Sequence, residues 1–128
     1  METVFVLVLG GVLALILVSQ WRALSLARRQ RGDPAPPQAA GCVLPTVYYF
    51  HSPRCAPCRS LSPRIDALAQ RHPGQVITVD VSEDPAQAAS FHVRATPTTV
   101  LVKDGLIVEV LLGPQSAKRL EALLPGPQ

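Results

Sequence analysis

Cysteine and aromatic residues are scarce in this chain of 128 residues, and its positive charge is concentrated near the N-terminus. Three cysteines are too few for a scaffold built on several disulfides. Aromatic residues make up 5% of the chain, and eight Lys and Arg against seven Asp and Glu leave the part from residue 46 onward a net charge of only +1. The sequence therefore has no basic stretch interleaved with aromatic residues, and we expect no nucleic-acid partner.

Apolar residues, in contrast, are abundant near the N-terminus. As a helix, residues 3–19 would be about 26 Å long, close to the hydrocarbon core of a bilayer at about 30 Å. Trp21 suits the membrane interface, and Arg22 can reach the lipid headgroups. A cleaved signal peptide would need a basic start, whereas the one charge before the run is acidic, and no Ala-x-Ala-like cleavage site follows directly. We expect one membrane-spanning anchor at about 3–21 that contacts the lipid bilayer.

Basic residues follow this anchor, and they predict its orientation. Four arginines lie in residues 22–31, whereas no Lys or Arg precedes the apolar run. By the positive-inside rule, the basic flank stays in the cytoplasm, and so does the domain that follows. Residues 1–31 are therefore expected to form an anchor with a basic juxtamembrane flank.

Proline dominates the next segment, residues 32–45, with four prolines in fourteen residues. This Pro/Ala-rich composition predicts a semi-rigid, extended linker that holds the domain away from the bilayer. Cys42 lies in this linker and is expected to be a spare thiol, with lipidation or a mixed disulfide as the alternatives.

Residues 46–128 are expected to form one small α/β domain. The hydrophobic period switches along the chain between that of a strand and that of a helix, and Lys103-Asp104-Gly105 indicates a tight hairpin turn. The predicted order is β-α-β-α-β-β-α in one mixed four-stranded sheet, with the first two strands parallel. The strands are expected at 46–51, 75–81, 98–103 and 106–112, and the helices at 55–72, 85–91 and 116–124.

Cys55-Ala56-Pro57-Cys58 is the motif around which the domain is organised. It follows a strand and opens a helix, so the first sulfur lies at a helix N-terminus, where a thiolate is favoured. The pattern predicts reversible dithiol–disulfide chemistry; the alternatives are a zinc half-site, a structural disulfide or two unrelated cysteines. No second Cys-x-x-Cys and no His-x-x-x-His completes a zinc site, and we expect neither a metal nor a cofactor.

The domain resembles the thioredoxin family from about residue 46 to residue 124. The motif has its proline, Pro57, at the same position as the proline of the family's Cys-Gly-Pro-Cys. Pro63 matches the family's helix-kinking proline, and Ala95-Thr96-Pro97-Thr98 matches its cis-proline loop. The hairpin turn and Gly113 also match. The resemblance implies a thioredoxin-like fold preceded here by one transmembrane helix.

The resemblance also implies a role for each site residue. Cys55 would be the nucleophile and Cys58 the buried resolving thiol, forming a redox-active disulfide pair. Pro97 would be cis, and Thr96 would offer backbone groups to an extended substrate peptide beside Ala56 and Pro57.

Several residues depart from the family pattern. Arg54 replaces an aromatic residue and is expected to lower the pKa of Cys55. His51 replaces a tryptophan and is a candidate proton relay, although the plainer interpretation is that it fills a surface position. Tyr49 replaces the buried acid, and Thr78 its lysine partner, which removes the usual base for Cys58. The family's first strand and helix are also missing.

The sequence therefore predicts a single-pass, membrane-anchored thiol–disulfide oxidoreductase that exchanges disulfides with protein thiols and disulfides. The alternative is a redox-inactive or weakly active binding or assembly module with the same fold. Many anchored proteins of this kind work outside the cytoplasm, so an extracytoplasmic, periplasmic domain stays open beside the cytoplasmic one.

Overall fold

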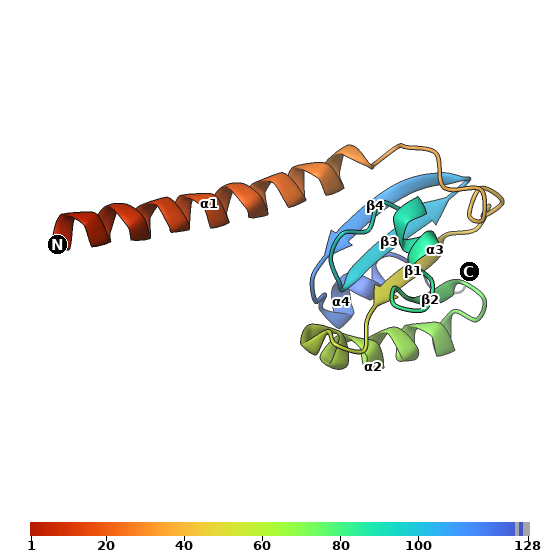
Figure 1. Cartoon of the computed structure of the whole chain (residues 1–128). Helices are drawn as coiled ribbons and strands as arrows, with labels where there is room; N and C mark the ends of the chain where they lie inside the picture. Colours follow the sequence, from red (N-terminus) through yellow and green to blue (C-terminus); the bar gives the residue numbers. More distant parts are fainter. Residues whose placement is uncertain (125, 127–128) are drawn as a thin grey trace.

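A computed structural model describes residues 1–124 and 126 of the chain. A long helix, α1, leads into one small domain with a four-stranded mixed sheet (Figure 1). The expected C-terminal boundary at residue 128 lies outside the described residues. The elements are α1 Glu2–Arg29, β1 Thr46–His51, α2 Ala56–Arg71, β2 Val76–Asp80, α3 Pro85–Ser90, β3 Thr98–Lys103, β4 Leu106–Leu112 and α4 Ala117–Glu121.

The sheet has the strand order β2-β1-β3-β4, which confirms the predicted fold. β1 pairs with β2 in parallel and with β3 in antiparallel fashion, and β3 and β4 form the expected hairpin. β1 is central and buried along nearly its whole length, as its β-branched and aromatic residues predict. Asp104 and Gly105, both at positive φ, form the tight turn between β3 and β4.

Two hydrophobic clusters cover the two faces of this sheet. On one face α2 and α4 pack through Leu61, Ile65, Leu68 and Leu120. On the other face Phe91, at the end of α3, packs against the rings of Tyr48 and Phe50 at centroid distances of 4.8 and 5.2 Å. Side-chain caps begin the short helices: Asp84 accepts from the backbone N–H of Gln87, and Ser116 from that of Arg119.

The proline-rich segment 32–45 is not the extended linker that its composition predicts. It folds back on the second sheet face, where Ala39 is completely buried and Ala35 nearly so. Its backbone pairs with the β3–β4 hairpin: the N–H of Gly32 donates to the carbonyl of Ile107 at 2.7 Å, and that of Ala35 to the carbonyl of Gly105 at 2.8 Å. Proline has no backbone N–H and so interrupts regular β-sheet pairing, but it does not prevent the small alanine side chains beside it from packing on the sheet. This segment therefore joins the domain rather than spacing it from α1.

Gly105 marks the closest approach between this segment and the hairpin. A Cβ on Gly105, at φ 72°, would lie 2.8 Å from the carbonyl oxygen of Ala40, whereas one on Gly74, at φ 78°, would meet nothing. Both glycines share the backbone strain of a left-handed conformation, so only the steric contact differs. We expect Gly105→Ala to lower the free energy of unfolding by about 2 kcal/mol more than Gly74→Ala. Denaturant unfolding of both full-length variants in detergent micelles measures the difference; equal losses would contradict the contact.

α1 combines the predicted apolar span with the basic flank in one unbroken helix. Glu2–Leu26 has a mean hydropathy of 2.4, none of its most apolar stretch is buried, and the residues described contain no other helix of this length and hydropathy. Such a helix fits a membrane span and equally a signal sequence. Its last turns lie beside β4 (Figure 1).

Candidate active site

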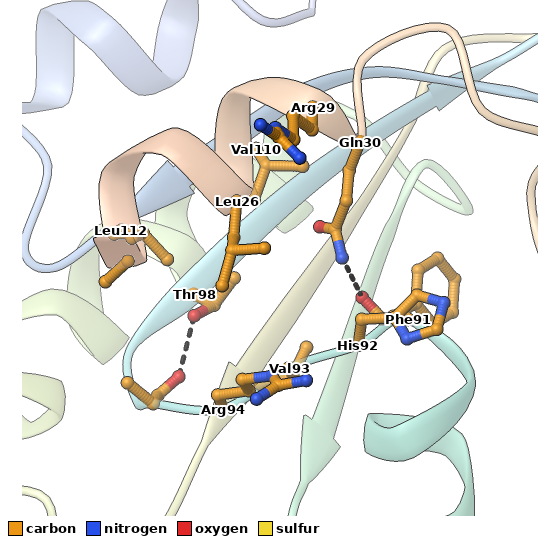
Figure 2. A pocket seen from close by; sticks show the side chains of 12 residues that line it. Leu26, Arg29, Gln30, Phe91, His92, Val93, Arg94, Thr98, Val110 and Leu112 are labelled. Carbon is orange, nitrogen blue, oxygen red and sulfur yellow. Dashed lines mark hydrogen bonds between the residues drawn. The ribbon is translucent and has the colours of Figure 1, made fainter. Parts of the chain in front are cut away.

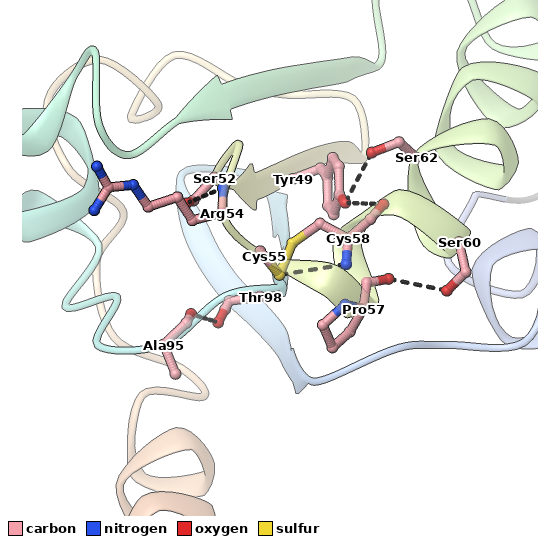
Figure 3. The surroundings of a disulfide bond; sticks show 10 residues. All are labelled: Tyr49, Ser52, Arg54, Cys55, Pro57, Cys58, Ser60, Ser62, Ala95 and Thr98. Atoms are coloured by element: carbon pink, nitrogen blue, oxygen red, sulfur yellow. Dashed lines mark hydrogen bonds between the residues drawn. A yellow bond between two sulfur atoms is a disulfide. The ribbon is translucent and has the colours of Figure 1, made fainter.

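Cys55 and Cys58 form a disulfide at the N-terminus of α2, with their Cα atoms 5.3 Å apart (Figure 3). Cys55 is the N-cap residue of this helix, and its sulfur accepts a hydrogen bond from the backbone N–H of Cys58 at 3.3 Å. Pro57, in the first turn, suits a position where no backbone donor is needed. Cys55 is 8% exposed and Cys58 3% exposed, while Ala56 and Pro57 between them face solvent. The more accessible sulfur therefore lies at the positive end of the helix dipole.

The loop that precedes β3 lies beside this pair. The Thr96–Pro97 peptide bond is cis, as the resemblance implies, and Pro97 is buried. The Thr98 hydroxyl donates to the carbonyl of Ala95 at 2.7 Å and closes the turn (Figure 3). Thr96 is half-buried at the edge of the loop. The cysteines and the loop thus come together from distant parts of the sequence.

Tyr49, which the resemblance aligns with the family's buried acid, lies beneath the cysteines. Its hydroxyl donates to the carbonyl of Cys58 at 3.4 Å and lies 3.2 Å from the Ser62 hydroxyl oxygen (Figure 3). Burial raises the pKa of Tyr49 above its usual value, the Ser62 hydrogen bond opposes this, and the negative charge of Asp66 adds to it. The phenol therefore stays protonated at neutral pH and cannot serve as a base.

His51, the last residue of β1, stacks on Tyr49 with ring centroids 5.4 Å apart. It pairs across the sheet with Asp80. The pKa of Asp80 lies below its usual value, chiefly because the side chain and backbone N–H of Ser82 donate to its carboxylate, with a smaller contribution from His51. His51 is thus held between an aromatic ring and a carboxylate beside the disulfide.

A cavity of about 370 Å³ opens next to the cysteines, and we call it the cysteine cavity. His51 and both cysteines line it, together with two residues that the sequence reasoning missed, Ser62 and Asp66. A signal existed in the spacing, because Cys58, Ser62 and Asp66 follow one another at four-residue intervals along one face of α2. Asp66 is the acidic side chain of this cavity.

Arg54 lies just before Cys55 but is not directed at the sulfurs. Its side chain is exposed and extends away from the disulfide, while its backbone N–H donates to the Ser52 hydroxyl at 3.2 Å (Figure 3). Its charge therefore reaches Cys55 through solvent, where it is screened. Residues 1–124 contain no group of three His, Cys, Asp or Glu side chains that could hold a metal ion.

Comparison with known proteins gives matches to thioredoxins. The family model described as thioredoxin matches residues 43–125. The chain belongs to the thioredoxin family. Thioredoxin 1 of Synechococcus elongatus is 35% identical over 72 residues, which cover 55% of this chain and 67% of that protein. Thioredoxin of Porphyra purpurea is 32% identical over 83 residues, or 63% of this chain and 78% of the relative.

Solved structures of thioredoxins also superpose on this chain. The Fasciola hepatica protein matches with a TM-score of 0.58 and 29% identity, covering 79% of this chain and 88% of its own. A thioredoxin variant from Halobacterium salinarum matches with a TM-score of 0.59 and 34% identity, covering 64% and 73% respectively. Together with the cysteine pair, this membership makes the chain a thiol–disulfide oxidoreductase of the thioredoxin type.

Proposed function

We propose that this thioredoxin-family chain is a single-pass, membrane-anchored oxidoreductase that exchanges disulfides with protein substrates through Cys55 and Cys58. The observation that carries the proposal is the helix-capping Cys55 sulfur, with Cys58 below it and the cis-proline loop beside it. A nucleophile, its resolving partner and a peptide-binding edge are thereby combined in one place.

In the proposed reaction the reduced pair acts in two steps. The Cys55 thiolate attacks one sulfur of a substrate disulfide; a new S–S bond forms, the substrate bond breaks, and the leaving thiolate takes a proton from solvent. Cys58 then loses its proton and attacks the Cys55 sulfur, which re-forms the disulfide seen in the structure and releases the substrate as a dithiol. The two electrons pass from the cysteine pair to the substrate.

Neighbouring residues support each step in this proposal. The α2 N-terminus stabilises the Cys55 thiolate, and Arg54 adds a weaker, screened attraction. The backbone of Thr96 pairs with an extended substrate segment that passes over Ala56 and Pro57. His51 and Asp66, which line the cysteine cavity, accept the proton of Cys58 through the hydroxyls of Tyr49 and Ser62.

The anchor and its flank complete the proposal. Residues 3–21 of α1 cross the bilayer, and the arginines that follow this span, in the last turns of α1 and just beyond it, keep the domain on the cytoplasmic side. A cytoplasmic domain is kept reduced by the cellular thiol pool and therefore acts as a reductase of substrate disulfides. An extracytoplasmic domain would be kept as the disulfide and would oxidise substrate thiols. A reporter fused to the C-terminus and active only in the cytoplasm would support this orientation; activity only outside would reverse it.

Trapping of mixed disulfides tests the exchange itself. In a Cys42→Ser background, Cys58→Ser is expected to accumulate substrate proteins linked to Cys55, because the resolving thiol is gone while the nucleophile remains. Non-reducing electrophoresis of rapidly acid-quenched cells measures these adducts, and Cys42→Ser with Cys55→Ser and Cys58→Ser is the matched control. If the trap variant forms no more adducts than the control, and the unmutated protein does not reduce insulin disulfides, the chain is a binding module instead.

A further inference from the structure

A second cavity, of about 290 Å³, lies between the end of α1 and the cis-proline loop (Figure 2). We call it the α1 cavity. The thioredoxin-family model begins only at residue 43, so one wall of this cavity comes from a part of the chain outside the family match. Its main walls are Leu26 and Arg29 of α1, Phe91, Val93 and Arg94 of the connection after α3, and Val110 of β4.

Several contacts fix α1 where it forms this wall. The Gln30 side-chain amide donates to the carbonyl of Phe91 at 3.5 Å (Figure 2). Arg31 forms an ion pair with the half-buried Glu109 of β4, and the backbone of Gly32 pairs with Ile107. Because these contacts follow α1 directly, the helix is docked on the domain and is not free to swing on a linker.

This docking sets the height of the active site relative to the membrane. Ala23, only two residues after the interfacial Trp21, lines the α1 cavity together with Ala95 and Thr98, which flank the cis-proline bond. Two residues of helix rise about 3 Å, so the loop lies close to the level at which α1 leaves the bilayer. In Figure 1 the N-terminal part of α1 projects past the end of the sheet at which α2 begins, which is the cysteine end. With α1 spanning the bilayer as proposed, the cysteines therefore face the lipid surface.

The chemistry of the walls indicates what the α1 cavity can hold. Leu26 points from α1 toward Thr98 (Figure 2), and the half-buried Val93 and Leu112 add apolar surface. Arg29 and Arg94 bring positive charge from two sides of the same cavity. An apolar side chain next to an acidic one matches this combination.

We propose that the α1 cavity binds the juxtamembrane segment of a membrane-protein substrate. An apolar side chain of that segment enters between Leu26 and Val93, an acidic neighbour pairs with Arg29 and Arg94, and the segment continues along the cis-proline loop to present its cysteine to Cys55 near the bilayer. This inference rests on the proposed function and narrows the substrates to membrane proteins with a disulfide close to the lipid surface. The anchor then serves as part of the recognition site, beyond its role in localisation.

Transmembrane peptides in phosphatidylcholine vesicles test the proposal with the reduced full-length protein. Each probe peptide carries one cysteine as a mixed disulfide with thionitrobenzoate, either about three or about fifteen residues beyond its apolar span, so that attack by Cys55 and resolution by Cys58 release thionitrobenzoate and peptide thiol. We expect the near cysteine, flanked by a Leu-Glu pair, to react about tenfold faster than the distant one, because docking raises its effective concentration. A soluble mixed disulfide, run in parallel, reports the exchange chemistry alone.

Matched variants separate the cavity from the exchange chemistry. Leu26 and Leu24 are 46% and 49% exposed on the same helix, but only Leu26 lines the cavity. Leu26→Trp is expected to slow the near peptide about tenfold relative to Leu24→Trp. Arg94→Glu should slow the Leu-Glu peptide, and a Leu-Lys peptide should restore its rate, which a merely misfolded variant could not show.

Each outcome decides between the two claims. If the unmutated protein releases no thionitrobenzoate even from the soluble disulfide, the proposed function fails. If it reacts with the soluble disulfide but treats near and distant peptides alike, or if both tryptophan variants behave alike, the α1 cavity is not a substrate site. Loss of the near-peptide preference when phosphatidylglycerol is added, without a charge-swap rescue, would assign the cavity to an anionic lipid and overturn the proposal.

Discussion

Replacement of both His51 by glutamine and Asp66 by asparagine is expected to slow the resolution of mixed disulfides about a hundredfold near neutral pH. Cys58 is almost fully buried, and its thiol must lose a proton before it can attack. The resemblance aligns Tyr49 with the family's buried acid. Burial raises the pKa of Tyr49, so the phenol cannot take the proton. Besides the two cysteines, His51, Arg59 and Asp66 are the ionisable side chains that line the cysteine cavity. Arginine stays protonated, so His51 and Asp66 are the two that can accept a proton.

The path from Cys58 to these groups runs through two hydroxyls. Ser62 lies one helical turn after Cys58, and Asp66 one turn after Ser62, so the three side chains share one face of α2. The Tyr49 hydroxyl lies 3.2 Å from the Ser62 oxygen, and its ring carries the stacked His51. A protonated phenol can accept and donate at once, which suits it to pass a proton rather than hold one. Tyr49→Phe is therefore expected to cost less than the double variant, about tenfold.

A pH profile distinguishes proton relay from a structural effect. The mixed disulfide between Cys55 and thionitrobenzoate is formed first, and the second release is followed by stopped flow from about pH 5 to about pH 9. Without the relay, the rate should rise about tenfold for each pH unit, because hydroxide becomes the base, whereas the unmutated protein should show a plateau. Asp84→Asn, which removes a carboxylate that caps α3, is the matched control and should keep the plateau. If the double variant has the same rate and plateau as the unmutated protein, neither residue relays the proton.

Local patterns explain why most of the fold could be predicted from the sequence. β-Branched and aromatic residues predict the strand Thr46–His51, and a core-facing stripe of Leu61, Ile65 and Leu68 predicts α2. Lys103-Asp104-Gly105 specifies its hairpin through residues that accept positive φ. Each of these signals lies within a few residues, and the thioredoxin motifs then fix how the pieces are assembled.

Contacts between distant segments were the part that sequence reasoning could not supply. The prolines of residues 32–45 show that a regular helix or strand is excluded, but they carry no information on whether the segment packs. Ala35 and Ala39 are as compatible with solvent as with a sheet face. The α1 cavity could not be predicted for the same reason, because nothing near Leu26 in the sequence indicates that Arg94 lines the same cavity. Asp66 was missed although its spacing from Cys58 and Ser62 is visible in the sequence, because its proposed role depends also on Tyr49, which comes from a different element.

A substitution on the buried side of the proline-rich segment is therefore the most sensitive test of whether this segment packs on the sheet. Ala39 is completely buried in the cluster that contains Tyr48 and Phe91, where it helps to cover one face of the sheet. Its neighbour Ala40 is exposed. Ala39→Asp is expected to lower the free energy of unfolding by about 4 kcal/mol, because an unpaired carboxylate loses its hydration there, whereas Ala40→Asp should cost less than about 0.5 kcal/mol.

Denaturant unfolding of both full-length variants in detergent micelles measures this difference. Where Ala39→Asp leaves part of the domain folded, it should also release the segment from the hairpin and with it the docked end of α1. The preference for near over distant cysteines would then fall toward one, because a freely tethered domain no longer holds its cysteines at the bilayer surface. Equal stability of the two aspartate variants would show that the segment is the extended linker its prolines suggest, and that α1 does not position the active site.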